Sequence, residues 1–574
     1  MIVYLLLAWR GPRFRYHWRT MAIRVTFGIT FFLLLLNAVS EYVFWMEFSS
    51  RYNFIAVDYL VYTNEVVGNI RESYPLATIL LAIALFTVST VFLFRKALRP
   101  CMQDRPSFPR RFAMAAGSII AATILLALYI PPGWQYFSNN NFINELAGNG
   151  PYDFVQAFKK NELDYYTYYK TIPDDEAFNL VKNQLLDSFS RYTSNEPLDI
   201  ERVVRHSGNE NNMNVVLISV ESFSASFMKA FGNTQNLTPY LDSIAGEGLL
   251  FTSLYAAGTR TVRGLEALSL SIPPLPGQSL VKRPDNGDLF SLGSVLKKKG
   301  YITQYLYGGY SYFDNMHEFF SHNGYSVIDR SALRKDEIHY ANIWGVADED
   351  LFGLAIRQMD SNSRAGRPFF SHIMTVSNHR PFTYPENRID IAPSTQSREG
   401  AVKYTDYCIG RFLQEAAKKT WFKKTIFIIV ADHCASSAGK TALPVTGYHI
   451  PMIIYSPGNI PPGVYSGLTS QLDIAPTILG MLQMTYTSRF FGRDLFHSNS
   501  TARSFISTYQ GLGYLVGDTL LVQTPVKKIA AYQVDFTTGA ARPLLSPPLL
   551  EREAIAFYQV AAWMIRHKKF SASD

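Results

Sequence analysis

The chain has 574 residues, which is too long for one ordinary domain, and 48% of them are hydrophobic. Its formal net charge is +8, and residues 1–135, the most apolar part, carry 13 Lys/Arg against 6 Asp/Glu. A basic surplus confined to an apolar segment indicates a membrane topology signal and argues against a nucleic-acid-binding surface.

Three segments, near residues 21–46, 75–94 and 112–130, are long and apolar enough to cross a bilayer as helices, which takes about 20 residues each. Runs of this length with so few charges are rare in the cores of soluble proteins. Arg and Lys cluster before the first segment and between the second and third. By the positive-inside rule these two basic regions are cytoplasmic, and everything after residue 131 lies outside the cytoplasm.

The remaining chain changes character twice. Turn-forming residues follow the third segment, and residues 152–192 have the pattern of amphipathic helices. From about 213 to 500, apolar strands alternate with helical stretches, which is typical of a parallel sheet covered on both faces. We therefore expect four parts. They are a membrane anchor at 1–134, a helical linker at 135–212, an α/β domain at 213–500 and a C-terminal part at 501–574 with edge strands and a closing helix.

Two of the predicted strands end in side chains that ligate metals. Residues 214–220 form an apolar, β-branched run that ends at Glu221, and residues 425–431 form a similar run that ends at Asp432 and His433. Buried parallel strands have this composition, and open α/β sheets bind ligands at the carboxyl ends of their strands. Two carboxylates and an imidazole at one edge of a sheet predict a metal site.

Thr261 could add a hydroxyl to this site. It stands just before an apolar helical run, where a threonine is a natural N-cap and where the helix favours a phosphate or an ionised oxygen. A hydroxyl becomes a nucleophile when a divalent metal lowers its pKa. With the three side chains at the strand ends, Thr261 would supply a ligand set that suits Mn²⁺ or Zn²⁺. Taken alone, Thr261 is an ordinary cap, and Thr259 is an equally good local candidate.

Two histidines flank predicted strands. His379 follows an apolar strand in the sequence Ser-Asn-His-Arg-Pro, and His449 precedes one in Gly-Tyr-His-Ile-Pro. A solvated loop histidine is the default interpretation of each. Their shared place at strand edges is equally compatible with phosphate binding or acid/base work.

Together these motifs resemble the alkaline phosphatase and sulfatase superfamily. They are more closely similar to the membrane-anchored lipoteichoic acid synthase family, whose members also occur in Gram-negative bacteria. The supporting sequences are RYNFIAVDYL at 51–60, LTPYL at 237–241, GTRT at 258–261, WGVAD at 344–348, SNH at 377–379, ADH at 431–433 and QLDIAPT at 471–477. The resemblance implies transmembrane helices followed by a sulfatase-like three-layer α/β/α catalytic domain.

The resemblance also implies roles for individual residues. The nucleophile would be Thr261, and His379 would face the substrate phosphate. A weaker correspondence puts His449 near the metal and Trp344 beside the glycerol-phosphate head group. The implied metal is Mn²⁺, with Zn²⁺ or Mg²⁺ as alternatives. The implied metal-binding set is Glu221, Thr261, Asp432 and His433.

The activity implied is a two-step transfer at the bacterial inner membrane. A phosphoglycerol-type head group would pass from a phospholipid donor to Thr261, and then to a glycan or lipid acceptor on the periplasmic side. A phosphodiesterase or phosphonate hydrolase that uses water as the acceptor stays open, as does a lipid-binding sensor without catalysis. A sensor should have lost metal ligands, but all four positions carry competent side chains.

Two departures narrow the choice within the superfamily. The Cys-x-Pro-x-Arg or Ser-x-Pro-x-Arg motif that yields the formylglycine of true sulfatases is absent, so a sulfate ester is a poor substrate candidate. Phosphoethanolamine transferases for lipid A typically carry several disulfides in this domain. The three scattered residues Cys101, Cys408 and Cys434 do not supply them.

Overall fold

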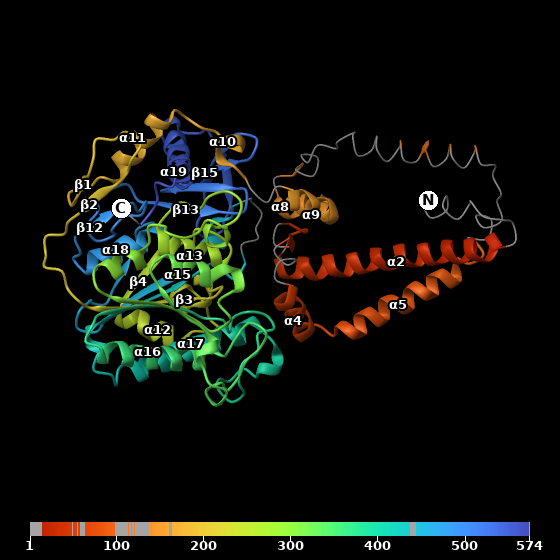
Figure 1. Ribbon diagram of the computed structural model, residues 1–574, viewed down its shortest axis with the longest axis horizontal. Helices are drawn as coiled ribbons and strands as arrows, with labels where there is room; N and C mark the ends of the chain where they lie inside the picture. The colour runs from red at the N-terminus through yellow and green to blue at the C-terminus, as the bar shows by residue number, and fades with distance from the viewer. Residues whose placement is uncertain are drawn as a thin grey trace. The chain divides into compact units, whose positions relative to one another are not determined.

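The computed structural model describes residues 14–48, 50–53, 56–57, 63–97, 140–159, 163–436 and 443–572, with isolated positions between 109 and 138. The chain forms two compact units (Figure 1). The smaller comprises residues 1–57 and 70–155, and the larger comprises residues 58–69 and 156–574.

The smaller unit contains two long apolar helices that pack side by side, α2 (Phe14–Phe48) and α5 (Leu76–Leu93). Phe31 and Phe86 stack between them with ring centroids 6.0 Å apart. Residues 21–48 of α2 and all of α5 are long and apolar enough to cross a membrane. They coincide with the first two predicted spans, whereas the predicted span at 112–130 falls largely outside the described residues.

The larger unit is built on a nine-stranded sheet in the order β10-β4-β9-β8-β3-β7-β5-β6, with β11 paired to β4. Helices α12, α16 and α17 lie on one side of it and α13, α15 and α18 on the other (Figure 1). The strands are β3 (Asn214–Val220), β4 (Leu249–Tyr255), β5 (Ile302–Tyr307), β6 (Ser326–Ile328), β7 (Phe369–Met374), β8 (Thr425–Ala431), β9 (His449–Tyr455), β10 (Gly463–Tyr465) and β11 (Thr469–Ser470). The helices are α12 (Pro239–Glu247), α13 (Thr261–Leu270), α14 (Leu292–Lys298), α15 (Met316–His322), α16 (Asp348–Arg364), α17 (Arg398–Ala416) and α18 (Ile474–Met481).

The predicted parallel pairing is right for the centre of the sheet and wrong for one strand. β3 pairs in parallel with both β7 and β8, whereas β9 runs antiparallel to β8 and β4. Parallel strands need a crossover of a dozen or more residues, usually a helix. In the described part of the connection from β8 to β9 there is only a short 3₁₀ turn at Val445–Tyr448, so the chain returns antiparallel.

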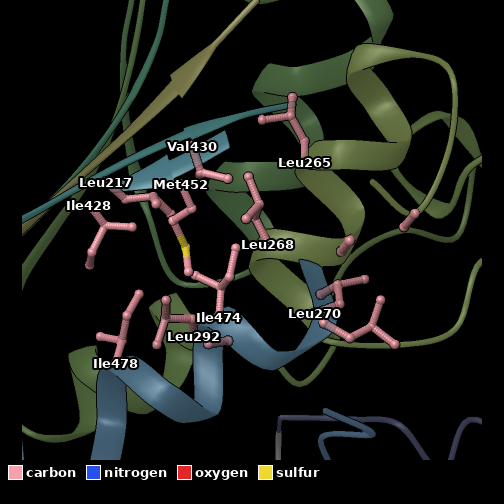
Figure 2. Packing of buried hydrophobic residues seen from close by; sticks show 14 of the residues in the cluster. Leu217, Leu265, Leu268, Leu270, Leu292, Ile428, Val430, Met452, Ile474 and Ile478 are labelled. Carbon is pink, nitrogen blue, oxygen red and sulfur yellow. The ribbon is translucent and has the colours of Figure 1, made fainter. Parts of the chain in front are cut away.

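The central strands are apolar because both of their faces are covered. All seven residues of β3 and all seven of β8 are buried. Figure 2 shows their side chains against the helices on one side of the sheet, where Leu217, Ile428 and Val430 face Leu268 of α13 and Ile474 of α18. Burying a side chain of this size stabilises the fold by about 1.5–3 kcal/mol, so this layer fixes where the strand ends lie.

Two smaller sheets complete the larger unit. β1 (Ser190–Tyr192), β2 (Arg202–Val204) and β12 (Tyr486–Ser488) form an antiparallel sheet. The second is a five-stranded antiparallel meander, which closes with α19 (Pro548–Arg566) against α11 (Asp174–Leu185). Its strands are β13 (Arg503–Ser507), β14 (Leu512–Val516), β15 (Thr519–Thr524), β16 (Lys528–Val534) and β17 (Ala541–Leu544).

Candidate active site

The ends of the two central strands bring three metal-ligating side chains together. Val220 of β3 and Ala431 of β8 are direct neighbours in the parallel register, so the next residues in each strand meet at one edge. These are Glu221 on one strand and Asp432 and His433 on the other. Their ligand atoms all lie within 4.8 Å of one another, and all three residues are buried.

The hydroxyl of Thr261 joins this cluster. Thr261 is the first residue of α13, its Oγ1 donates a hydrogen bond to Glu221 Oε2 at 3.0 Å, and Arg260 occupies the N-cap position. The interpretation of Thr261 as a cap is therefore wrong, and in the described structure Thr259 makes no hydrogen bond to the cluster. Gly264 allows the close approach of α13, because a Cβ there would lie 2.4 Å from the carbonyl oxygen of Asp432.

His433 presents one ring nitrogen to the cluster. Its Nδ1 lies 2.7 Å from the carbonyl oxygen of Cys434, to which it would donate. That assignment leaves Nε2 as the lone-pair atom, 3.5 Å from Asp432 Oδ2 and 3.7 Å from Glu221 Oε1. Burial lowers the pKa of His433 to about 4, so the ring is neutral at physiological pH, as a metal ligand must be.

His379 and Trp344 form the exposed side of the site. His379 Nε2 lies 3.3 Å from Glu221 Oε1, and 27% of the His379 side chain is accessible to solvent. The rings of His379 and Trp344 stack with centroids 4.5 Å apart, and the indole Nε1 donates to the carbonyl oxygen of Arg380. A substrate approaching from solvent would meet these two rings before it reached the buried carboxylates.

His449 is not brought into the cluster. It is the first residue of β9, and its Nε2 lies 2.8 Å from the carbonyl oxygen of Thr252. Its ring stacks on Tyr255 and meets the edge of Phe231. Its backbone carbonyl accepts a hydrogen bond from the thiol of Cys434, so its link to the cluster runs through the backbone.

The two carboxylates have opposite electrostatic environments. Burial raises the pKa of Asp432 well above its usual range, and the charge of Glu221 raises it further. Burial also disfavours the charged form of Glu221, but His379, His433 and the Ser222 hydroxyl together hold the pKa of Glu221 below its ordinary value.

The donor set fits a divalent cation. Asp432 Oδ2 is buried and has no hydrogen-bond partner within the described residues. Leaving a buried carboxylate oxygen unpaired is costly, and a cation would satisfy it. Two carboxylates, an imidazole and a hydroxyl suit Mn²⁺ or Zn²⁺ and allow Mg²⁺.

Sequence reasoning missed the residues that hold the strand ends in place. Ser222 has φ 49°; its backbone N–H donates to Asp432 Oδ1 at 2.8 Å and its hydroxyl to Glu221 Oε1 at 2.6 Å. The Asn378 amide donates to the carbonyl oxygens of Glu221 and Ser222, and the Gln471 amide donates to that of Asp432. Asn378 and Gln471 lie in motifs that carried the family resemblance, which was the one signal that could have found them.

Comparisons with known proteins show which proteins this chain is similar to. A family model described as Sulfatase matches residues 213–484. Lipoteichoic acid synthase 1 of Bacillus subtilis is 27% identical over 319 residues, so the alignment covers half of this chain and about half (49%) of that relative. The lipoteichoic acid synthase of Staphylococcus aureus is 22% identical over 508 residues, which is 81% of this chain and 74% of the relative. A crystal structure from Vibrio parahaemolyticus is 32% identical and superposes with a TM-score of 0.66, covering 71% of this chain and 99% of that one; its description places it in the alkaline phosphatase superfamily.

The fold and the site define an enzyme with a sulfatase-type α/β domain, either a transferase or a hydrolase. The chain belongs to the alkaline phosphatase superfamily. Its similarity to lipoteichoic acid synthases confirms the resemblance drawn from the motifs, and the predicted α/β fold class is confirmed as well.

Proposed function

We propose that this enzyme is a membrane-anchored, metal-dependent transferase. It moves a phosphoglycerol-type head group from a phospholipid to a glycan or lipid acceptor through a phospho-threonine intermediate. The observation that carries the proposal is the hydrogen bond from the Thr261 hydroxyl to buried Glu221, at the start of a helix and beside Asp432 and His433. Two apolar helices long enough to cross a membrane support the anchor. The excess of Arg and Lys before the first predicted span and between the second and third supports an inner-membrane anchor with the site on the periplasmic side.

The residues proposed to hold the cation are Glu221, Thr261, Asp432 and His433. The mixed oxygen and nitrogen donors favour Mn²⁺, with Zn²⁺ and Mg²⁺ as alternatives. When bound, the cation would lower the pKa of the Thr261 hydroxyl and favour its deprotonated form.

In the first step, Thr261 Oγ1 attacks the phosphorus of the lipid head group. A Thr–O–P bond forms while the bond from phosphorus to the diacylglycerol oxygen breaks, and that oxygen takes up a proton. His379 is proposed to donate this proton or to stabilise the charge on the phosphoryl oxygens, because it is the solvent-accessible imidazole beside Glu221. The N-terminus of α13 favours the phosphate at the same place.

In the second step, a hydroxyl of the acceptor attacks the phospho-threonine. The new bond joins the acceptor oxygen to phosphorus, the Thr261 oxygen leaves, and the proton of the attacking hydroxyl passes to a base, for which His379 is the candidate. Trp344, stacked on His379, is proposed to form a wall of the head-group pocket. With water in place of the acceptor, the same steps would make the enzyme a phosphodiesterase.

The test uses the full chain in nanodiscs that contain phosphatidylglycerol labelled in its glycerol head group, with Mn²⁺ and with or without a glycolipid acceptor. We expect diacylglycerol release that requires Thr261 and transfer of label to the acceptor. If the label appears only as free glycerophosphate, the enzyme is a hydrolase and not a transferase. No diacylglycerol from any phospholipid, with metal bound, would contradict both and favour the lipid sensor.

A further inference from the structure

A second group of metal-ligating side chains lies in the larger unit, and it shares no residue with the candidate active site. It consists of His206, Asp494 and His497. His206 follows strand β2, while the other two residues follow β12. Their ligand atoms all lie within 4.8 Å of one another. The proposed function gives this group no role.

The carboxylate of Asp494 is the centre of this group. Its Oδ2 lies 2.7 Å from Nδ1 of His497 and 3.8 Å from Nε2 of His206. The two imidazole rings lie with their centroids 4.9 Å apart. The ring of Phe189 packs against both, at 5.8 Å from His206 and 5.5 Å from His497, so an apolar ring covers the cluster.

His206 has no hydrogen bond that would explain its burial. Only 6% of the residue is exposed, yet neither ring nitrogen has a hydrogen-bond partner within the described residues. Buried polar side-chain atoms in native proteins nearly always have a partner, and an unsatisfied one costs about 1–3 kcal/mol. The separation of 3.8 Å from Asp494 is too long for a hydrogen bond.

The distances from Asp494 to the two histidines fit three ligands that share one cation. Zn²⁺ binds imidazole nitrogen and carboxylate oxygen at about 2.0–2.2 Å, which puts tetrahedral ligand atoms about 3.4 Å apart. The two distances to Asp494 Oδ2 lie on either side of that value, so each would change by well under 1 Å on binding.

The backbone leaves room for this carboxylate. Gly480, in α18, faces it, and a Cβ there would lie 1.9 Å from Asp494 Oδ2. The other carboxylate oxygen, Oδ1, accepts a hydrogen bond from the backbone N–H of Phe496 at 3.0 Å. The hydrogen bond to Oδ1 therefore orients the Asp494 carboxylate, and its Oδ2 faces the two imidazole rings.

We propose that His206, Asp494 and His497 form a second metal site, separate from the candidate active site, that binds Zn²⁺. Two imidazoles and one carboxylate are a donor set for zinc, whereas Mg²⁺ and Ca²⁺ take oxygen ligands. The cation ties the segment between β2 and β3 to the segment after β12, which are almost 300 residues apart in the chain. The side chain of His497 is 28% exposed, which gives the ion a route to the site.

In the test, the full chain in detergent is loaded with Zn²⁺ and desalted. The metal ions bound per chain are then counted by elemental mass spectrometry. We expect two zinc ions on the wild type, and one after the double change Glu221→Gln, Asp432→Asn. Adding His206→Gln or His497→Gln to that double variant should remove the last ion. Adding His322→Gln, a change at an exposed histidine of α15, is the matched control and should leave it.

Loading with Co²⁺ gives a second measurement, because its visible absorption reports the ligands. The spectrum of the double variant should show nitrogen and oxygen ligands and should vanish with either histidine change. The proposal is overturned if the double variant binds no metal. It is also overturned if the double variant keeps its ion after His206→Gln and after His497→Gln. If His206→Gln does not fold, the partly exposed His497→Gln decides the matter.

Discussion

The two histidine and carboxylate clusters of the larger unit have similar compositions and different surroundings. The cluster at Glu221 and Asp432 lies on the ends of adjacent strands at the centre of the main sheet, with a threonine hydroxyl hydrogen-bonded to it. The cluster at His206 and Asp494 lies on chain segments beside a small three-stranded sheet, under the ring of Phe189. The difference teaches that ligands alone do not make a reaction centre. The first cluster adds the hydroxyl of Thr261 at a helix N-terminus, and the stacked rings of His379 and Trp344.

The largest expected effect in this comparison comes from removing the hydroxyl of Thr261, the proposed nucleophile. Thr261→Ala should reduce diacylglycerol release from phosphatidylglycerol by a factor of about 10⁴ or more, because the Thr261 hydroxyl is the proposed carrier of the phosphoryl group. Zinc binding at the second cluster should not change. Thr259→Ala is the matched control and should keep the activity. Loss of activity in Thr259→Ala with activity kept in Thr261→Ala would assign the role to the other threonine.

Removing a ligand of the first cluster should come next. Asp432→Asn should lower activity at least 100-fold, since even residues that only support metal ligands typically cost 10–100-fold. Metal analysis should show one ion fewer while the second cluster stays loaded. Excess Mn²⁺ should restore part of the activity if weakened binding is the cause. Full activity in metal-free buffer would contradict a metal role for Asp432.

His379→Ala should have an intermediate effect. A positioned acid or base contributes typically 10²–10⁴-fold, so kcat should fall by about that factor with metal content unchanged. Trp344→Ala should act more on KM than on kcat, because that ring is proposed to bind the head group. A His379→Ala enzyme with unchanged kcat would exclude His379 from proton transfer. If His379→Ala and Trp344→Ala change kcat and KM by the same factors as each other, the two stacked rings act as one binding surface.

Substitutions in the second cluster should have the smallest effect on activity and the clearest effect on stability. A ligand at 100 times its Kd stabilises a protein by about 2.7 kcal/mol, so Zn²⁺ should raise the unfolding temperature of the wild type. In the Glu221→Gln, Asp432→Asn background, where only the second cluster is expected to bind Zn²⁺, His497→Gln should abolish the rise. In the otherwise wild-type enzyme, His497→Gln should leave the diacylglycerol release rate unchanged. Thermal unfolding with and without Zn²⁺, in the Glu221→Gln, Asp432→Asn background, isolates this cluster. An equal rise in both proteins would show that the stabilising zinc binds elsewhere.

The sequence predicts the first cluster because each of its residues follows a recognisable local signal. Glu221 and Asp432 directly end apolar strands, and parallel pairing of neighbouring strands brings such ends together. Thr261 marks a helix start, although only the structure shows that its hydroxyl bonds Glu221 and does not cap the helix. β9 was predicted as a strand, but its direction depends on a connection whose path the pattern does not encode.

The second cluster could not be predicted in this way. His206 and Asp494 stand in irregular segments almost 300 residues apart, without apolar periodicity on either side. The pairing of β2 with β12 brings these segments together, and both strands have only three residues. The supporting residues Asn378 and Gln471 were also beyond pattern reasoning, because a buried amide bonded to a backbone carbonyl has no periodic signature.

Thr261 is proposed to carry the transferred group as a covalent intermediate. The most direct measurement is the intact mass of the 574-residue chain in detergent, after brief incubation with Mn²⁺ and phosphatidylglycerol in the absence of an acceptor. The wild type should gain the mass of one glycerophosphoryl group, Thr261→Ala should gain none, and peptide mapping should place the group on Thr261. The same added mass on Thr261→Ala, or a mapped site at any other residue, would contradict this role of Thr261.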